Sequence, residues 1–291
     1  MKRVATCPVC HRVTLRPFAA IMFGDQLHFA QVRCADCGLV ISQPQASQDE
    51  MDDYYRHRYF EQHWSDAPAL SAMNRSRHER VTLPAFRQLW SGWIHAGVRV
   101  LEVGCGYGAM LHALRDEGFD PIGIDPSLRA VSFCRSQGLR VTVGAAPELP
   151  FAKESFDVVI ARHVIEHVAM PPDFVSALAA SVRPGGVLAF ETENIWASQY
   201  VWDRVRAFVT GRIPPFRTST DHTFVFAASH LQQMLSREGG CSDVRTEVFN
   251  DEPPSESWHW RLYKGTFRHI DRWTGLGEFL VAAGRKRAAE A

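Results

Sequence analysis

Four cysteines near the N-terminus stand in two pairs with identical spacing. Cys7 and Cys10 enclose two residues, Cys34 and Cys37 do the same, and 23 residues separate the pairs. Two such C-x-x-C turns supply four thiolates, which is the ligand set of a structural tetrahedral zinc site. A redox dithiol would need only one pair. We therefore expect a structural zinc ion at Cys7, Cys10, Cys34 and Cys37, whose binding stabilises a segment too short to build its own core.

A second group of residues that could bind a ligand lies in VLEVGCGYGAML, residues 100–111. Here an apolar run is followed by Gly104, Gly106 and Gly108. Glycines allow the sharp reversal from strand to helix and let a ligand approach the backbone. The spacing is not the G-x-G-x-x-G of dinucleotide-binding proteins. Glu102 precedes the glycines inside the strand, where a buried carboxylate suits a cationic ligand. Asp125 ends the next expected strand and suits the hydroxyls of a ribose.

Histidines and a carboxylate gather in RHVIEHV, which contains His163, Glu166 and His167, and His222 follows later in the chain. Three interpretations compete for them. One of His163, His167 and His222 acts as a general base, since histidine titrates near neutral pH. Alternatively, these histidines and Glu166 bind a second, divalent metal ion. In the third, the side chains merely support the loop by hydrogen bonding.

Alternating apolar strands and amphipathic helices must position these groups. We expect strands at 98–103, 121–125, 139–143, 156–161 and 187–192, with helices at 109–118, 127–138 and 173–182. Such alternation predicts βαβ units and a parallel sheet. We further expect a hairpin between the cysteine pairs, helices at 75–89, 229–240 and 258–275, strands at 244–250 and 277–286, and a turn at Pro184-Gly185-Gly186.

Five blocks in this order resemble the class I S-adenosylmethionine-dependent methyltransferases: VLEVGCGYG, GIDPS, GAAPELPF, FDVVIARHVIEHV and RPGGVLAFETEN. The resemblance implies an α/β fold, a doubly wound Rossmann-like methyltransferase sheet with a small N-terminal zinc-binding module. It also implies a cofactor site made by Glu102, Gly104, Gly106, Gly108, Asp125, Pro126, Ala145, Ala146, Arg162 and His163. Relatives often carry an acidic residue where this chain has Ala145, so backbone groups are expected to hold the adenine amino group here.

We divide the 291 residues into a zinc-binding module (1–45), a helical linker or cap (46–97) and a methyltransferase domain (98–291). Residues 195–222 form a lid over the acceptor or a helix that packs on the domain. Their aromatic side chains are Trp196, Tyr200, Trp202, Phe208 and Phe216.

Charge and hydropathy limit the partners. The chain has 32 basic and 32 acidic residues, so no global positive field attracts nucleic acid. No apolar run approaches the roughly 20 residues that cross a bilayer, and the N-terminal residues lack the apolar core of a secretory signal. Together with the paired cysteines, this favours a cytoplasmic protein without membrane attachment. No oligomeric state is predicted.

The expected activity is methyl transfer from S-adenosylmethionine to a small-molecule acceptor, most simply a hydroxyl in secondary-metabolite or glycan biosynthesis. The segment YYRHRYF after the cysteines resembles zinc-containing methyltransferases of deoxysugars. The H-x-x-E-H string resembles the E-x-x-E-H metal motif of ubiquinone-pathway and small-RNA O-methyltransferases, with His163 in place of the first glutamate. Alternatives are N- or C-methylation, an RNA methyltransferase that grips RNA with its zinc module, and a cofactor-binding scaffold without transfer activity.

Overall fold

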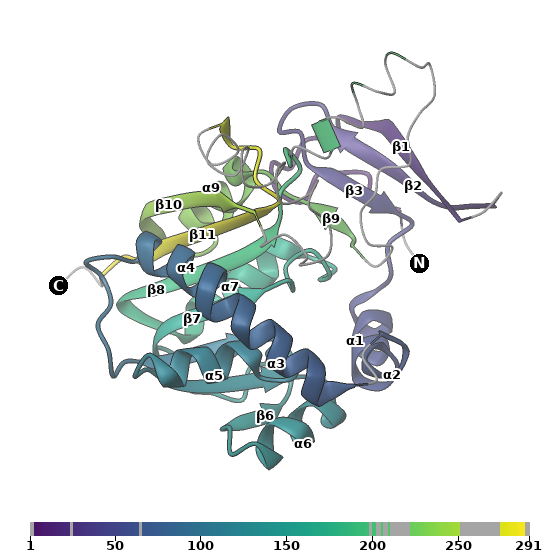
Figure 1. Ribbon diagram of the computed structural model, residues 1–291. Coiled ribbons are helices and arrows are strands. Elements are labelled where there is room, and N and C mark those ends of the chain that lie inside the picture. Colours follow the sequence, from purple (N-terminus) through teal and green to yellow (C-terminus); the bar gives the residue numbers. More distant parts are fainter. Residues whose placement is uncertain are drawn as a thin grey trace.

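The computed structural model describes residues 3–23, 26–63, 66–197, 200–201, 205, 209, 222–250 and 274–288 (Figure 1). The helix expected at 258–275 lies almost entirely outside these residues. No helix in this described part of the chain is both long and apolar enough to cross a membrane.

A seven-stranded sheet with the order β10-β11-β8-β7-β4-β5-β6 forms the centre of the molecule. Five strands run parallel, while β11 is antiparallel to both β8 and β10. This arrangement confirms the predicted doubly wound sheet and adds an antiparallel strand at one side. The strands are β4 (Arg99–Val103), β5 (Asp120–Asp125), β6 (Val141–Val143), β7 (Phe156–Arg162), β8 (Val182–Glu193), β10 (Cys241–Phe249) and β11 (Phe279–Lys286).

Helices cover both faces of this sheet because successive strand residues point to opposite sides. Val100, Val158 and Ile160 pack against α4 (Leu83–Leu89) and α5 (Ala109–Asp116). Their neighbours Leu101 and Val159 pack against α7 (Pro171–Ser181) and α9 (Ala228–Arg237). The central strands are therefore buried on both faces, as their continuous apolar runs predict.

The turn expected at Pro184-Gly185-Gly186 is an irregularity inside β8 rather than its boundary. Phe156 of β7 pairs with Val182 of β8, and Val158, two residues later, pairs with Val187, five residues later in β8. The intervening residues bulge out of the ladder, and the strand continues through them. The sequence prediction placed the start of the strand too late for this reason.

A helical cap precedes the sheet in the chain. It comprises α1 (Gln48–His57), α2 (Tyr59–His63), α3 (Ala67–Arg77) and a π-helical turn (His78–Thr82) that continues into α4. Ser47 begins α1 with a capping box: its hydroxyl accepts from the Glu50 N–H at 3.2 Å, and the Glu50 carboxylate accepts from the Ser47 N–H at 2.8 Å. The predicted helix at 75–89 is thus found, with an earlier start.

The N-terminal segment forms a second sheet with the order β1-β2-β3-β9 (Figure 1). The predicted hairpin is β1 (Leu15–Phe23) and β2 (Gln26–Cys34), and β3 (Val40–Gln43) pairs with β2. The fourth strand, β9 (Phe224–Val225), comes from the far end of the chain. The module thus shares a sheet with a segment that adjoins His222.

Candidate active site

A cavity opens where β4, β5 and β7 reach their carboxyl ends, which is the usual ligand position in open α/β sheets. The cap helices line its other side, so the cavity lies between the sheet edge and α1–α3. Eight of the ten residues predicted to hold the cofactor line it: Gly104, Gly106, Asp125, Pro126, Ala145, Ala146, Arg162 and His163. The cap contributes apolar and aromatic side chains, namely Met51, Tyr55, Tyr59, Phe60 and Leu70, and an equal number of polar ones, namely Gln48, Asp52, Ser71, Asn74 and His78.

Asp125 is fixed at the end of β5 by the glycine turn beside it. One carboxylate oxygen accepts from the Gly106 N–H and the other from the Ser127 N–H, both at 2.9 Å. Burial raises the pKa of Asp125 to about 6, although these two backbone donors oppose the shift. A carboxylate held this rigidly at the cavity wall fits two adjacent hydroxyls of a ribose.

Gly108 lies at the start of α5 and does not line the cavity. Its φ of +73° is in the left-handed region, and a Cβ there would collide with Leu139 and lie 2.9 Å from the Cys134 sulfur. Both neighbours lie at or beyond α6 (Leu128–Ser136). This glycine therefore allows close packing of the turn against that helix.

Glu102 is buried behind the glycine turn and also does not line the cavity. Its Oε1 lies 3.4 Å from Nε of Arg162, while its Oε2 has no hydrogen-bond partner among the described residues. Burial raises the pKa of Glu102 to about 7, and the Arg162 cation opposes this shift. The free oxygen of this carboxylate can accept one more donor.

Arg162 belongs to a buried charge network that sequence reasoning did not identify. Its Nη1 lies 3.3 Å from Glu191 and 2.9 Å from Nδ1 of His78. Arg77 approaches the other oxygen of Glu191 at 3.3 Å. Glu191 interrupts the apolar run VLAFET just as Glu102 interrupts VLEV. A carboxylate within an apolar strand was therefore the sequence signal for this charge network. The network holds the Arg162 guanidinium at the cavity wall.

His163 lies between two carboxylates, with Nδ1 3.2 Å from Glu166 and Nε2 3.5 Å from Glu191. Burial alone would lower the pKa of His163, but hydrogen bonding to Glu166 and Glu191 outweighs it and raises the pKa to about 9. A histidine that is protonated at neutral pH donates protons rather than accepting them. Among the three histidines, this geometry favours His167 or His222 over His163 as a general base.

Glu166, His167 and His222 form a compact cluster. One ligand atom from each lies within 4.8 Å of the others. The centroids of the His167 and His222 imidazole rings are 4.7 Å apart, and Nδ1 of His222 is 3.3 Å from Oε2 of Glu193. His167 also lines the cavity and contacts the Tyr55 ring at 5.5 Å. The cluster therefore reaches the cavity through His167, the one member that lines it.

The Glu166 carboxylate of this cluster has an unused oxygen. Its Oε1 pairs with His163, whereas its buried Oε2 has no hydrogen-bond partner in the described chain. Burial would raise the pKa of Glu166, but His163 and the two neighbouring histidines lower it to about 2. An ionised, buried carboxylate oxygen beside two imidazoles is a donor set that fits a divalent cation. His163 is not part of this set, because its ring nitrogens face Glu166 and Glu191.

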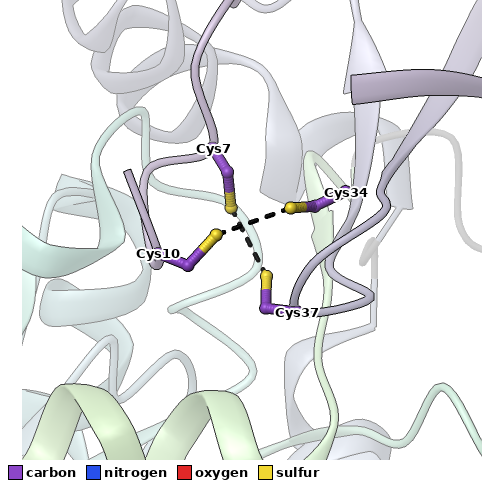
Figure 2. A group of neighbouring side chains, drawn as sticks. All are labelled: Cys7, Cys10, Cys34 and Cys37. Atoms are coloured by element: carbon purple, nitrogen blue, oxygen red, sulfur yellow. Dashed lines mark hydrogen bonds between the residues drawn. The ribbon is translucent and has the colours of Figure 1, made fainter. Parts of the chain in front are cut away.

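The four N-terminal cysteines converge on one point, as Figure 2 shows. The sulfurs of Cys7 and Cys37 are 3.6 Å apart, and those of Cys10 and Cys34 are 3.5 Å apart. Tetrahedral zinc with Zn–S bonds of about 2.3 Å places its sulfurs about 3.8 Å apart. In each turn, the N–H of the residue after the second cysteine donates to the carbonyl of the first, at 2.9 Å for Cys7 and 3.0 Å for Cys34. The cluster is thus compatible with zinc.

The aromatic segment 195–222 is described only in part. Tyr200 is buried and its hydroxyl donates to Glu193 at 3.0 Å, whereas Trp196 is 41% exposed. Trp202, Phe208 and Phe216 lie outside the described residues. The choice between a lid and a packing helix stays a prediction.

Comparison with known proteins relates this site to a family. A family model described as "Methyltransferase domain" matches residues 55–244. The ubiquinone biosynthesis O-methyltransferase of Roseobacter denitrificans is 31% identical over 172 residues, which cover 57% of this chain and 68% of that protein. Its counterpart from Azorhizobium caulinodans is 38% identical over 160 residues, which cover 53% and 63%. The chain thus matches about two thirds of the length of these relatives.

Solved structures show the same fold at lower identity. A methyltransferase in complex with the Haloferax volcanii Trm112 methyltransferase activator has a TM-score of 0.55 and 21% identity, over 84% of this chain and all of that one. An S-adenosylmethionine-dependent methyltransferase of Thermotoga maritima has a TM-score of 0.53 and 19% identity, over 76% of this chain and 95% of that one. These similarities concern the fold alone.

Proposed function

Because the chain belongs to the methyltransferase domain family and is an S-adenosylmethionine-dependent enzyme, we propose that it methylates a hydroxyl group of a small molecule bound in the cavity. The observation that carries this proposal is the cluster of Glu166, His167 and His222 at the cavity border. A hydroxyl must lose its proton during methyl transfer, and this cluster offers groups that promote that loss. The similarity to O-methyltransferases supports the choice of oxygen as the acceptor atom.

S-adenosylmethionine supplies the electrophilic methyl group, and the residues around the cavity hold it. Asp125 takes the ribose hydroxyls, while Pro126, Ala145 and Ala146 lie beside the adenine. Glu102, which lies behind the glycine turn, takes the ammonium of the methionine end through water at its free Oε2, and Arg162 faces the carboxylate. Rate enhancement then comes chiefly from aligning donor and acceptor and excluding water.

The cluster has two ways of acting on the acceptor hydroxyl. A divalent cation bound by Glu166, His167 and His222 would lower the pKa of the hydroxyl as a Lewis acid. Without a cation, His167 is placed to take the proton, because it lines the cavity and its neighbour His222 contacts Glu193. We favour the metal, since the unused Glu166 oxygen otherwise remains buried without a donor.

The cap suggests a planar acceptor. Tyr55 and His167 border the same part of the cavity, and two further aromatic rings of the cap, Tyr59 and Phe60, line it. Aromatic and apolar walls with a few polar groups are typical of small-molecule sites. We therefore favour a phenolic hydroxyl and extend the proposal to secondary metabolites and glycans as wider candidate classes. We assign the four-cysteine cluster to structural zinc.

The test is methyl transfer from radiolabelled S-adenosylmethionine to a panel of catechols, sugars and amines, with and without Mg²⁺ or Mn²⁺. We expect transfer to a hydroxyl, a loss of at least about 100-fold in His222→Ala, and unchanged activity in His95→Ala, an exposed histidine outside the cavity. EDTA should abolish transfer while the zinc content stays constant. Exclusive transfer to amines, or to ribosomal RNA fragments, would overturn the proposal.

A further inference from the structure

The junction between β3 and β9 connects the N-terminal module with the candidate active site. β3 follows the second cysteine pair, and β9 begins two residues after His222. The two strands are antiparallel, with Val40 opposite Val225 and Ile41 opposite Phe224. A strand of the module therefore runs directly beside the segment that carries a member of the catalytic cluster.

Ser42 is the residue of β3 that holds this segment. Its N–H donates to the Thr223 carbonyl at 2.8 Å, and its hydroxyl donates to the His222 carbonyl at 2.9 Å. The amide of Gln31, from β2, donates to the same hydroxyl at 3.5 Å. Ser42, Gln31 and His222 are all buried. A buried serine that donates to His222 and accepts from Gln31 has its hydroxyl orientation fixed.

The same backbone segment also holds Glu166. The N–H groups of Thr223 and Phe224 donate to the Glu166 carbonyl at 2.8 and 3.2 Å. Ser42 therefore fixes the backbone of His222 and Thr223, and Thr223 in turn fixes the backbone of Glu166. Two of the three cluster residues depend on one short chain of hydrogen bonds that starts in the module.

Two other contacts dock the module without touching this segment. Gln233 of α9 donates to the Val9 carbonyl at 2.8 Å, and His230 of the same helix contacts the Cys37 carbonyl at 2.8 Å. These bonds attach the cysteine turns to the methyltransferase domain. They provide a matched control, because removing one weakens docking but leaves the β3–β9 junction intact.

We infer that Ser42 is a positioning residue for methyl transfer, and that the N-terminal module thereby forms part of the acceptor side of the active site. This inference rests on the proposed function of the Glu166, His167 and His222 cluster. Cofactor binding depends on other elements, the carboxyl ends of β4, β5 and β7 and the cap helices, none of which bonds to the Ser42 hydroxyl. Loss of the Ser42 hydroxyl should therefore impair transfer while leaving the affinity for S-adenosylmethionine unchanged.

The experiment compares wild type, Ser42→Cys, Ser42→Ala and Gln233→Ala as full-length, zinc-loaded proteins. Amide hydrogen exchange at Thr223 and Phe224 reports the junction directly. Exchange should accelerate about fivefold or more in Ser42→Ala, the effect of losing one buried hydrogen bond, and less in Ser42→Cys, whose thiol is a weaker donor. Gln233→Ala should leave exchange at these two amides unchanged.

Activity and cofactor affinity complete the test. With catechol as the acceptor probe, we expect kcat to fall about tenfold in Ser42→Ala, with the Kd for S-adenosylmethionine within twofold of wild type. Unchanged exchange and unchanged kcat in Ser42→Ala would overturn the inference, as would equal losses in Gln233→Ala. If wild type itself transfers no methyl to any hydroxyl, the proposed function fails, whereas the exchange rates still decide whether Ser42 holds the junction.

Discussion

Buried carboxylates around the cavity have pKa values shifted in opposite directions. Burial raises the pKa of Glu102 to about 7, and the nearby Arg162 cation only partly opposes this shift. At Glu166 the neighbouring histidines outweigh burial and lower the pKa to about 2. One carboxylate therefore titrates near neutral pH and the other stays charged. Glu102 can therefore lose its proton when a cationic ligand binds, whereas Glu166 stays ionised throughout the neutral pH range.

Cofactor affinity should consequently depend on pH through Glu102. S-adenosylmethionine carries a sulfonium and an ammonium group, so it binds better when Glu102 is ionised, and its affinity should rise as pH increases from 6.5 to 8. The gain should reach about three- to fourfold, because a group with a pKa of about 7 is roughly one quarter ionised at pH 6.5 and roughly nine tenths ionised at pH 8. Calorimetric titrations across this range measure it.

Glu102→Gln is the control for this prediction. Glutamine has a similar size but does not titrate, so the variant should bind more weakly at pH 8 and show a flatter dependence. An undiminished pH dependence in Glu102→Gln would assign the effect to another group. Asp125, with a pKa of about 6, would then be the first candidate.

At the scale of elements, segments with a clear apolar pattern were predictable. The strands between 98 and 194 are rich in β-branched residues and the helices have helical periodicity bounded by residues such as Ser127 and Gly118, and the structure contains them all. β3 and β9 have four and two residues, so they carry no readable period. They exist because β3 pairs with β2 on one side and with β9 on the other. The hydrogen bonds of Ser42 to the backbone of His222 and Thr223 could not be predicted either, because they depend on this strand pairing.

The candidate site shows a similar division. The glycine turn, Asp125 and the cysteine pairs are local motifs, and the sequence alone identifies them. The partners of Arg162 come from the cap, β4 and β8, and the sequence does not indicate which of these distant side chains contact one another. Only the folded chain could reveal that His163 lies between Glu166 and Glu191.

The packing of α5 against the region of α6 gives a prediction for Gly108. Gly108→Ala should lower the free energy of unfolding by about 2–4 kcal/mol, because it adds steric overlap with Leu139 and Cys134 to the strain of a left-handed residue. Gly138 has a similar φ of +70° but open space around its Cβ position. Gly138→Ala should therefore cost only about 1 kcal/mol. Denaturant unfolding of both variants measures the difference, and equal losses would contradict the packing argument.

At the scale of the whole molecule, the N-terminal module and the methyltransferase domain share one core. Cys7, Val9 and Leu39 belong to the same buried apolar cluster as Phe224 and Leu231. The module therefore contributes to the core on the α9 side of the central sheet. Residues on both sides of the predicted boundary near residue 45, the cysteine turns and the helical cap, therefore belong to one continuous structure.

Removing zinc should therefore destabilise the whole protein without abolishing cofactor binding. We expect about one zinc per chain in wild type and none in Cys34→Ser. The thermal midpoint of the variant should fall by at least about 5 °C, since zinc sites contribute about 10 kcal/mol or more in isolated modules and each kcal/mol shifts the midpoint of a domain of this size by about 2–4 °C. The Kd for S-adenosylmethionine should stay within about threefold of wild type, because β4, β5, β7 and the cap build that part of the cavity.

Cys241→Ser separates this effect from the general loss of a buried thiol. Cys241 is buried in the same apolar cluster but lies apart from the four-cysteine site. The variant should keep its zinc and lose less stability than Cys34→Ser, because the cost is then confined to local packing. A midpoint in Cys34→Ser no lower than in Cys241→Ser would mean that the metal contributes nothing to the shared core. Loss of cofactor binding in Cys34→Ser alone would mean that the module supports both sides of the active site rather than the acceptor side.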